Sequence, residues 1–323
     1  MKRFLSGVQP SGLPHLGNYF GAIAMHLALA QEGEAYWFIA DLHALTSLKD
    51  AARLREMTRE IAVTYLALGL DPQRTVFWRQ SDVPEVTEVA WLLSSVTGMG
   101  LLERGHSYKD KLAHGVTPNV GLFYYPVLMA ADILCFDADE VPVGKDQIQH
   151  VEFAQDMGGA FDAAYCPTFK RPEWRMSPTP RVLGLDGQKM SKSYGNALWI
   201  FEEGKALNKA LGKLPTDSRP PSEPKEPEGM LLFEWLKLLL APAEYEQLCT
   251  RARAGGEQGS GYGELKQRLA AAMDERFGAA REERKRLLAN PQHVDGVLAD
   301  GARRASAVAR AVRDRAYKAC GLR

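Results

Sequence analysis

The chain begins MKRFLSGVQPSGLPHLGNYFGAI (1–23), and this stretch predicts how the first part of the fold is built. The apolar run 3–9 indicates a buried strand, two glycine-bearing turns follow it, and residues 17–31 have helical apolar spacing. His15 and Asn18 stand at the junction of strand and helix. A helix start offers free N–H groups and the positive end of its dipole, so this turn is a candidate anion site. Taken alone, a loop histidine followed by a capping asparagine explains these residues equally well.

The alternation of strands and helices continues beyond this stretch. AYWFIAD (35–41) and TVFWRQS (75–81) are apolar enough to be strands buried on both faces, whereas 51–68 and 85–96 have helical spacing. This alternation predicts an α/β fold with a doubly wound, Rossmann-like parallel sheet. Ligands bind such sheets beyond the carboxyl ends of the strands. We therefore expect the segments that follow the strands, SGVQPSG, ADLHALT and RQSDVPE, at the ligand edge.

The pattern changes after Gly195. PTDSRPPSEPKEPEG (215–229) is rich in proline and charge, which predicts a surface loop or linker rather than a packed element. From Met230 onward only helical periods occur. We expect an α/β domain over residues 1–196 and an all-helical C-terminal domain over residues 197–323.

Charge and cysteine content narrow the class of protein. The formal net charge is zero, but residues 264–323 hold 14 Lys and Arg against 8 Asp and Glu. Such a basic tail can bind a polyanion, although a solvated helical face is the commoner explanation. The cysteine spacing suggests neither a disulfide framework nor a metal site (Cys135, Cys166, Cys249 and Cys320). With no secretory signal and no membrane-spanning apolar run, we expect a cytoplasmic protein without a membrane partner.

A second candidate anion site is GLDGQKMSKSYGN (184–196). Lys189 and Lys192 are three residues apart among small polar residues, and such flexible point charges can follow negative charge onto a leaving pyrophosphate. A charge run is usually a solvated turn. This one lies where the α/β pattern ends, which would allow it to fold over the ligand edge. It is no Walker loop, because GxxxxGK[ST] is absent from the sequence.

Taken together, PHLGN (14–18) and KMSKS (189–193) resemble the two signature motifs of the class I aminoacyl-tRNA synthetases. GVQPSG, HLGNYFGAI, ADLHALT, YYPVLMAADIL and VPVGKDQ are similar, in this order, to segments of the tryptophan-specific members. The resemblance covers nearly the whole chain. It implies that ATP, with Mg²⁺, activates L-tryptophan to tryptophanyl-AMP and pyrophosphate, that tryptophan then passes to tRNA(Trp), and that the protein is a homodimer. Residues 1–196 would be the catalytic domain and 197–323 the anticodon-binding domain.

The resemblance also implies which residues bind ATP. His15 and Asn18 would hold the phosphates, and Lys189 and Lys192 would neutralise the transition state without any covalent bond to substrate. VGKD (143–146) would hold the ribose and adenine, with a backbone contact from Val182. The full set expected to bind ATP is Gln9, Pro10, Ser11, Gly17, Asn18, Gly144, Lys145, Asp146, Val182, Lys189, Met190, Ser191, Lys192 and Ser193.

The choice of amino acid would depend on YYPVLMAADIL (124–134). If this segment is a helix, Tyr125, Met129 and Asp132 share one face. The resemblance implies that Met129 packs on the indole, that Asp132 accepts its N–H, and that Tyr125 and Gln147 hold the ammonium group. Phenylalanine would leave the carboxylate unpaired. Without the flanking motifs, the favoured interpretation is an apolar helix whose Asp132 caps a backbone group or pairs with an unidentified base.

Some residues depart from the family pattern, and rival functions remain. Phe4 and Leu5 stand where bacterial relatives carry an aromatic one position later, and Lys145 stands at a position that is often acidic. His43 is as easily a packed structural histidine as a functional one. The rivals are a tyrosine-specific relative, a catalytically idle binding module and a small-molecule ligase with the same motifs. In the basic tail the candidates for RNA phosphate contact are Arg303, Arg304, Arg310, Arg313 and Lys318.

Overall fold

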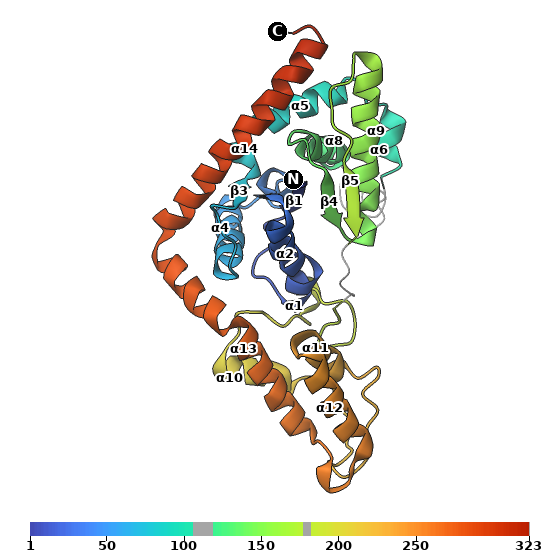
Figure 1. The fold of residues 1–323 in the computed structure, drawn as a ribbon, viewed down its shortest axis with the longest axis vertical. Coiled ribbons are helices and arrows are strands. Elements are labelled where there is room, and N and C mark those ends of the chain that lie inside the picture. The colour runs from blue at the N-terminus through green and yellow to red at the C-terminus, as the bar shows by residue number, and fades with distance from the viewer. Residues whose placement is uncertain (106–118, 177–181, 323) are drawn as a thin grey trace. The chain divides into compact units, whose positions relative to one another are not determined.

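The structure, a computed structural model, describes residues 1–105, 119–176 and 182–322 (Figure 1). The chain forms two compact units, each assembled from separate stretches of sequence. The first unit comprises Met1–Leu13, Ala22–Pro178 and Leu287–Arg323, and the second comprises Pro14–Gly21 and Thr179–Arg286. These units do not follow the boundary expected at residue 196, because the PHLGN turn joins the second unit and the C-terminal helix joins the first. The division of function between 1–196 and 197–323 stays a prediction.

A five-stranded parallel sheet forms the centre of the first unit, in the order β3-β2-β1-β4-β5 (Figure 1). Its strands are β1 (Arg3–Val8), β2 (Glu34–Ile39), β3 (Thr75–Arg79), β4 (Glu140–Val143) and β5 (Glu173–Met176). The predicted α/β class is therefore confirmed. The strand order reverses between β1 and β4, and in this kind of sheet ligands bind at such a switch point, beyond the carboxyl ends of the strands.

Helices connect the strands and build the core of the first unit. Buried Val127 and Ala130 on the helix 120–134 belong to one apolar cluster with Val151 and Met157 on the helix 148–164 and with residues of the sheet. In chain order these connections are α2 (Ala24–Glu32), α3 (Asp41–Ala44), α4 (Ala51–Ala67), η2 (Gln80–Asp82), α5 (Glu85–Ser94), α6 (Met99–Glu103), α8 (Val120–Leu134), η3 (Lys145–Gln147) and α9 (Ile148–Ala164). Within the described ranges, none of the helices is both long and apolar enough to cross a membrane.

The second unit is helical, as predicted for most of its sequence. It contains α1 (Leu16–Asn18), η4 (Lys192–Tyr194), α10 (Gly204–Gly212), α11 (Leu231–Leu239), α12 (Pro242–Ala254), η5 (Gly256–Gln258) and most of α13 (Tyr262–Ala289). The helix predicted over 17–31 is interrupted by η1 (Tyr19–Ile23), a π-helical turn. The boundary between the two units falls inside this turn, between Gly21 and Ala22.

The proline-rich segment 215–229 contains no helix or strand and is mostly exposed, as predicted for a surface loop, although individual side chains of it are buried within the second unit. Lys225 is only 1% exposed and donates to the carbonyl oxygens of Pro220 (2.8 Å) and Glu223 (3.1 Å). Its ammonium also lies 5.2 Å from the centre of the Tyr262 ring. A lysine can be buried when carbonyls and an aromatic face replace its water, and here this arrangement fixes the segment without regular secondary structure.

The last helix, α14 (Pro291–Ala319), covers the edge strand β3 of the first unit. One face of it carries small or apolar buried residues, Val294, Leu298, Gly301, Ala302, Ala305, Ala309, Val312 and Ala316. An exposed edge strand would offer unpaired backbone groups to other chains, and a helix laid against it prevents such pairing.

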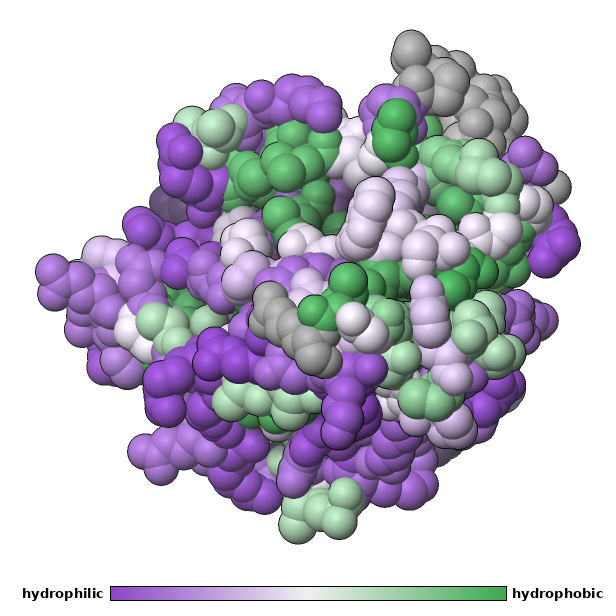
Figure 2. All heavy atoms as spheres, turned by 90° about the horizontal axis from the view of Figure 1, so that it is seen from above, coloured by the Kyte–Doolittle hydropathy of each residue, from purple (hydrophilic) through white to green (hydrophobic). Residues whose placement is uncertain are grey.

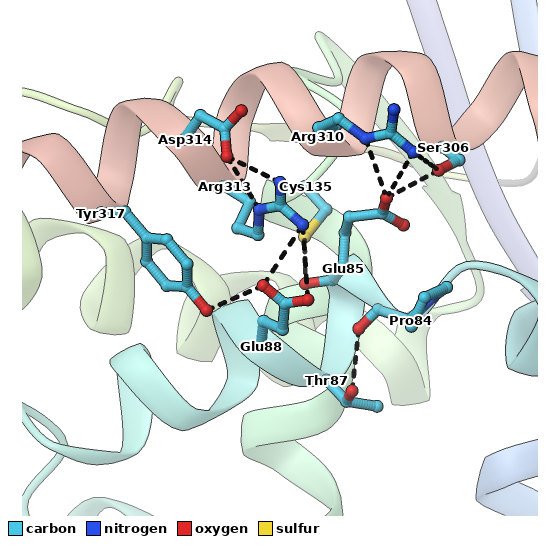
Figure 3. A network of polar contacts seen from close by, with 10 residues as sticks. All are labelled: Pro84, Glu85, Thr87, Glu88, Cys135, Ser306, Arg310, Arg313, Asp314 and Tyr317. Atoms are coloured by element: carbon cyan, nitrogen blue, oxygen red, sulfur yellow. Dashed lines mark hydrogen bonds and ion pairs between the residues drawn. The ribbon is translucent and has the colours of Figure 1, made fainter. Parts of the chain in front are cut away.

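Polar side chains on α14 attach this helix to α5 (Figure 3). Ser306 donates to Glu85 Oε1 at 2.7 Å, and Tyr317 donates to Glu88 Oε2 at 2.7 Å. Arg310 lies 3.4 Å from Glu85 Oε1. Arg313 lies 3.3 Å from Glu88 Oε2 and also pairs with its neighbour Asp314.

Several of the tail residues predicted to contact RNA phosphates also hold α14 in place. Arg310 and Arg313 pair with carboxylates of α5, and Arg304 donates to the carbonyl oxygens of Pro72 (2.7 Å) and Thr75 (3.3 Å). Contact of these residues with RNA stays a prediction.

Glycine at position 301 is required by the close approach of α14 to β3. A Cβ at this position would lie 1.8 Å from the backbone oxygen of Phe77, whereas a Cβ at Gly296 of the same helix would meet nothing within 4 Å. We expect Gly301→Ala to lower the free energy of unfolding by about 2 kcal/mol, because the backbone of β3 cannot yield as a side chain would. Gly296→Ala should raise it by roughly 0.5–1 kcal/mol through helix propensity. Urea unfolding of both variants tests this, and equal effects of the two substitutions would contradict it.

Candidate active site

The PHLGN turn is locked by reciprocal hydrogen bonds between His15 and Asn18. His15 is the N-cap of α1: its Nδ1 accepts from the backbone N–H of Asn18 at 3.2 Å, and Asn18 Oδ1 accepts from the backbone N–H of His15 at 3.2 Å. This is a capping box with histidine in the place of serine. The cap is thus His15 rather than Asn18. Gly17 allows the His15 ring to approach, since a Cβ there would lie 3.0 Å from the ring.

The loop 184–196 is closed by the side chain of Asn196, which is buried. Its Nδ2 donates to Asp186 Oδ1 (2.7 Å) and to the Lys189 carbonyl oxygen (3.1 Å), while its Oδ1 accepts from the Ser191 N–H (2.8 Å). The bond from Asn196 also holds the pKa of Asp186 below its usual value. One asparagine therefore closes the loop while the Lys189 side chain stays exposed.

The structure brings the PHLGN turn and the KMSKS loop together within the second unit. His15 and Trp199 form an antiparallel β-bridge, flanked by the bonds Leu16 N–H to Leu198 O (3.0 Å) and Ile200 N–H to Pro14 O (3.3 Å). The His15 and Trp199 rings are 6.1 Å apart, and Lys192 Nζ lies 5.8 Å from the Trp199 ring centre. The predicted convergence of the two motifs is thus present in the geometry.

Burial and charge set the protonation of His15. Burial, and to a lesser degree the positive charge of Lys192, lower its pKa from 6.5 to about 4. Because Nδ1 accepts from Asn18, the neutral ring carries its proton on Nε2. His15 can therefore donate a hydrogen bond from Nε2 without adding a charge.

Other predicted ATP-binding residues lie at the switch point of the sheet or in the loop. Gln9, Pro10 and Ser11 follow β1, and Gly144 and Lys145 follow β4, so both segments extend from the carboxyl ends of adjacent strands. The side chain of Asp146 lies outside the part of the chain that the structure describes. In the loop Val182 and Met190 are buried, Met190 Sδ accepts from the Gly17 N–H at 3.3 Å, and Ser191 Oγ lies 2.8 Å from Ser193 Oγ.

Asp132 is the centre of a buried polar cluster in the first unit. It is 1% exposed, its Oδ2 lies 2.8 Å from His43 Nε2, and Gln80 Nε2 donates to both of its oxygens at 2.7 and 2.8 Å. Gln80 Oε1 accepts from the Leu42 N–H at 3.1 Å, which fixes the orientation of the amide. Burial raises the pKa of Asp132, and the bonds from His43 and Gln80 oppose this shift. A carboxylate has about four acceptor sites, so it can still accept one more N–H.

Two histidines connect Tyr125 and Gln147 to the Asp132 cluster. His150 lies between Tyr125 and Gln147, and His43 lies between Tyr125 and Asp132. Tyr125 Oη lies 3.5 Å from His150 Nε2, and His150 Nδ1 lies 2.7 Å from Gln147 Oε1. The rings of Tyr125 and His43 meet edge to face with centres 6.4 Å apart. Met129, half-buried, lies on α8 one turn before Asp132. The structure therefore brings Tyr125, Asp132 and Gln147 into one connected group.

Sequence reasoning did not single out four residues of these clusters: Gln80, His150, Asn196 and Trp199. It named His43, but as easily a structural as a functional residue. Signals existed for Gln80, because RQSDVPE follows β3 at the expected ligand edge, and for Asn196, which ends the loop 184–196. His150 and Trp199 stood outside any motif whose chemistry was considered.

The described residues contain no cluster of side chains that suits a metal cation. Across the described ranges, no group of three or more His, Cys, Asp or Glu residues could hold a metal ion. The loop near His15 instead offers N–H donors and ammonium groups, which bind phosphate oxygens rather than Mg²⁺.

Comparison with known proteins gives these clusters a context. Residues 1–278 match the family model "tRNA synthetases class I (W and Y)". The chain belongs to this family. The predicted resemblance is confirmed.

Several relatives share nearly the whole length of this synthetase. The tryptophan–tRNA ligase of Rhodopirellula baltica is 49% identical over 322 residues, covering 99% of this chain and all (100%) of the relative. The tryptophanyl-tRNA synthetase of Campylobacter jejuni, solved with ADP and tryptophan, has a TM-score of 0.92 at 44% identity, covering 99% of this chain and 100% of that one. The Mycoplasma pneumoniae enzyme has a TM-score of 0.82 at 30% identity, covering 100% and 98%.

The protonation of His15 predicts a specific pH dependence. Since its pKa is about 4, the ring stays neutral through the range in which a free histidine with a pKa of 6.5 would titrate. We expect His15→Asn to lower kcat/KM for ATP in pyrophosphate exchange by the same factor at every pH between about 5.5 and 8.5. Parallel pH profiles of the synthetase and the variant test this. A ratio that changes several-fold near pH 6.5 would mean that His15 titrates there.

Proposed function

We propose that this chain is a tryptophan–tRNA ligase in which the PHLGN turn and the KMSKS loop act on one triphosphate. The activity itself follows from the family and from relatives of that name over the full chain. The observation that supports the site is that Lys192 and His15 both lie about 6 Å from the Trp199 ring, at 5.8 and 6.1 Å. The same geometry disfavours a binding module without catalytic activity, because such a module would not need a neutral N–H donor beside an ammonium group.

The proposed chemistry requires only alignment and charge. A carboxylate oxygen of L-tryptophan attacks the α-phosphorus of ATP, the bond from this phosphorus to the bridging oxygen breaks, and pyrophosphate leaves. His15 donates from Nε2 to a phosphate oxygen, Asn18 fixes the His15 ring, and Lys189 and Lys192 stabilise the charge that develops on pyrophosphate. Tryptophan then passes from the adenylate to the tRNA. Gln9, Pro10, Ser11, Gly144, Lys145, Asp146 and Val182 contribute the nucleoside contacts implied by the resemblance.

Magnesium accompanies the nucleotide in this proposal. The described residues lack an oxygen-ligand cage, so the phosphate oxygens and water would hold Mg²⁺, and it would supply further neutralisation of phosphate charge. The protein's own contribution stays with His15 and the loop lysines.

Asp132 supports the choice of tryptophan. His43 and Gln80 occupy all but about one of its acceptor sites, and the remaining site suits a single N–H donor. An indole supplies this N–H from a flat apolar ring, on which Met129 packs. A phenyl ring would bury the carboxylate without a partner, and Tyr125 and Gln147 would hold the ammonium group.

The partners beyond substrate are tRNA(Trp) and a second copy of the chain. Of the tail candidates, Arg303, Arg310 and Lys318 are exposed, so these three can reach phosphate, although Arg303 pairs with Asp300 and Arg310 with Glu85. For the second copy, α5, α6 and α8 expose Trp91 (72%), Met99 (63%) and Val120 (82%). Figure 2 looks onto the end of the first unit where α5 and the end of α14 lie, and shows apolar side chains gathered among charged ones.

Amino-acid-dependent pyrophosphate exchange tests the function. We expect exchange with tryptophan and at least roughly 100-fold less with tyrosine or phenylalanine, because neither can satisfy Asp132 as an indole does. Lys192→Ala should lower exchange by about 100-fold while tryptophan binding persists, as loss of one transition-state contact would do. Exchange stimulated by tyrosine and not by tryptophan would overturn the assignment of Asp132. Unchanged exchange in the variant would remove Lys192 from the mechanism.

Sedimentation tests the assembly. We expect a dimer for the native chain and a shift toward monomer for Trp91→Glu, since a carboxylate in an apolar interface is costly to desolvate. Trp174→Glu, at another exposed tryptophan (42%), is the matched control and should stay dimeric. A native chain that sediments as a monomer would contradict the proposal.

A further inference from the structure

Trp199 holds a defined place between the two phosphate-binding motifs. Its neighbours Leu198 and Ile200 are fully buried, whereas Trp199 itself is half-buried. In an extended segment successive side chains point to opposite sides, so burial of both neighbours turns the indole toward the opposite face. The bridge to His15 fixes the backbone of Trp199 relative to the PHLGN turn.

The indole lies near both an imidazole ring and a cation. The His15 ring lies 6.1 Å away, inclined by 52°, and Lys192 Nζ lies 5.8 Å from the indole centre. Tryptophan presents the best cation–π face of the natural side chains, and 5.8 Å is within the range of this interaction. An apolar side chain such as leucine would fill the same space without attracting an ammonium group.

We propose that Trp199 is a positioning residue for ATP: its indole face holds the Lys192 ammonium beside the His15 turn, so that both donors face the triphosphate before it binds. This inference rests on the proposed function. The ring lowers the number of places that the flexible lysine can occupy, and pre-placed donors need less ordering when phosphate arrives. An aromatic face attracts the charge of the ammonium without accepting a strong hydrogen bond from it.

The interaction explains a further property of the site. Burial lowers the pKa of His15, and the positive charge of Lys192 adds to this effect because the ammonium lies close to the turn. Without the ring, the four-carbon stem of Lys192 would let this charge move into solvent.

The experiment is a double-mutant cycle in tryptophan-dependent pyrophosphate exchange. Trp199→Leu should lower kcat/KM for ATP by about two- to five-fold, the range of a partly exposed cation–π contact, with KM for tryptophan unchanged. Trp199→Phe, which keeps an aromatic face, should retain most of the activity. In the Lys192→Ala background, Trp199→Leu should have no further effect, because the partner of the ring is already absent. Trp174→Leu controls for loss of an exposed tryptophan elsewhere and should behave as the native chain.

The outcomes separate this inference from the proposed function. If the native chain catalyses no exchange, the proposed function fails and the inference fails with it. If the native chain is active but Trp199→Leu and Trp199→Phe are equally active, or equally impaired, the aromatic face has no role and the inference alone is overturned. A loss that persists in the Lys192→Ala background also overturns it, since Trp199 would then act through the backbone bridge. If Trp199→Leu does not fold, as judged by urea unfolding, Trp199→Thr replaces it, because a β-branched residue suits the extended backbone.

Discussion

The backbone bridge between His15 and Trp199 is the interaction on which the nucleotide site depends. The turn at His15 follows β1 directly, yet it belongs to the second unit, with the loop that holds Lys189 and Lys192. The bridge and its two flanking hydrogen bonds attach the turn to residues 198–200 of the second unit. Both motifs that would meet the phosphates therefore belong to one unit, whereas the switch point of the sheet and the Asp132 cluster belong to the other. The chemistry is divided by unit and not by position in the sequence.

Concentrating cations in one place is costly, and the protonation of His15 reduces this cost. A charged His15 would lie close to the Lys192 ammonium in a partly dry environment, where like charges repel strongly. Burial and Lys192 together keep the ring neutral, and the cap from Asn18 decides which nitrogen carries the proton. The turn thus gains a hydrogen-bond donor without gaining a charge. The same logic applies at Asp132, where His43 and Gln80 stabilise a carboxylate that burial alone would drive toward its neutral form.

The sequence predicts what depends on local pattern. β1, β2 and β3 lie within two residues of their predicted ends, because apolar runs and turn residues define strands locally. The pairing of Asp132 with His43 and Gln80 was not predictable, since these residues are 89 and 52 positions away. Segment 215–229 is the surface loop that its proline content predicts, but the burial of Lys225 against Tyr262 depends on a partner that composition cannot show. The motif residues form two connected groups, one in each unit, and Gln80, His150 and Asn196, which orient them, were not foreseen.

The basic tail shows that cations counted along the sequence can be paired with distant carboxylates in the folded chain. The excess of cations over residues 264–323 suggests a surface for RNA when counted along the chain. Glu85 and Glu88 lie outside this segment, yet they meet Arg310 and Arg313 across the α5–α14 contact. Part of the excess is therefore neutralised within the first unit and serves to cover the edge strand β3. Fewer cations are therefore left to attract RNA than the number of Lys and Arg residues implies. The candidates for phosphate contact on α14 are the cations that this helix exposes to solvent.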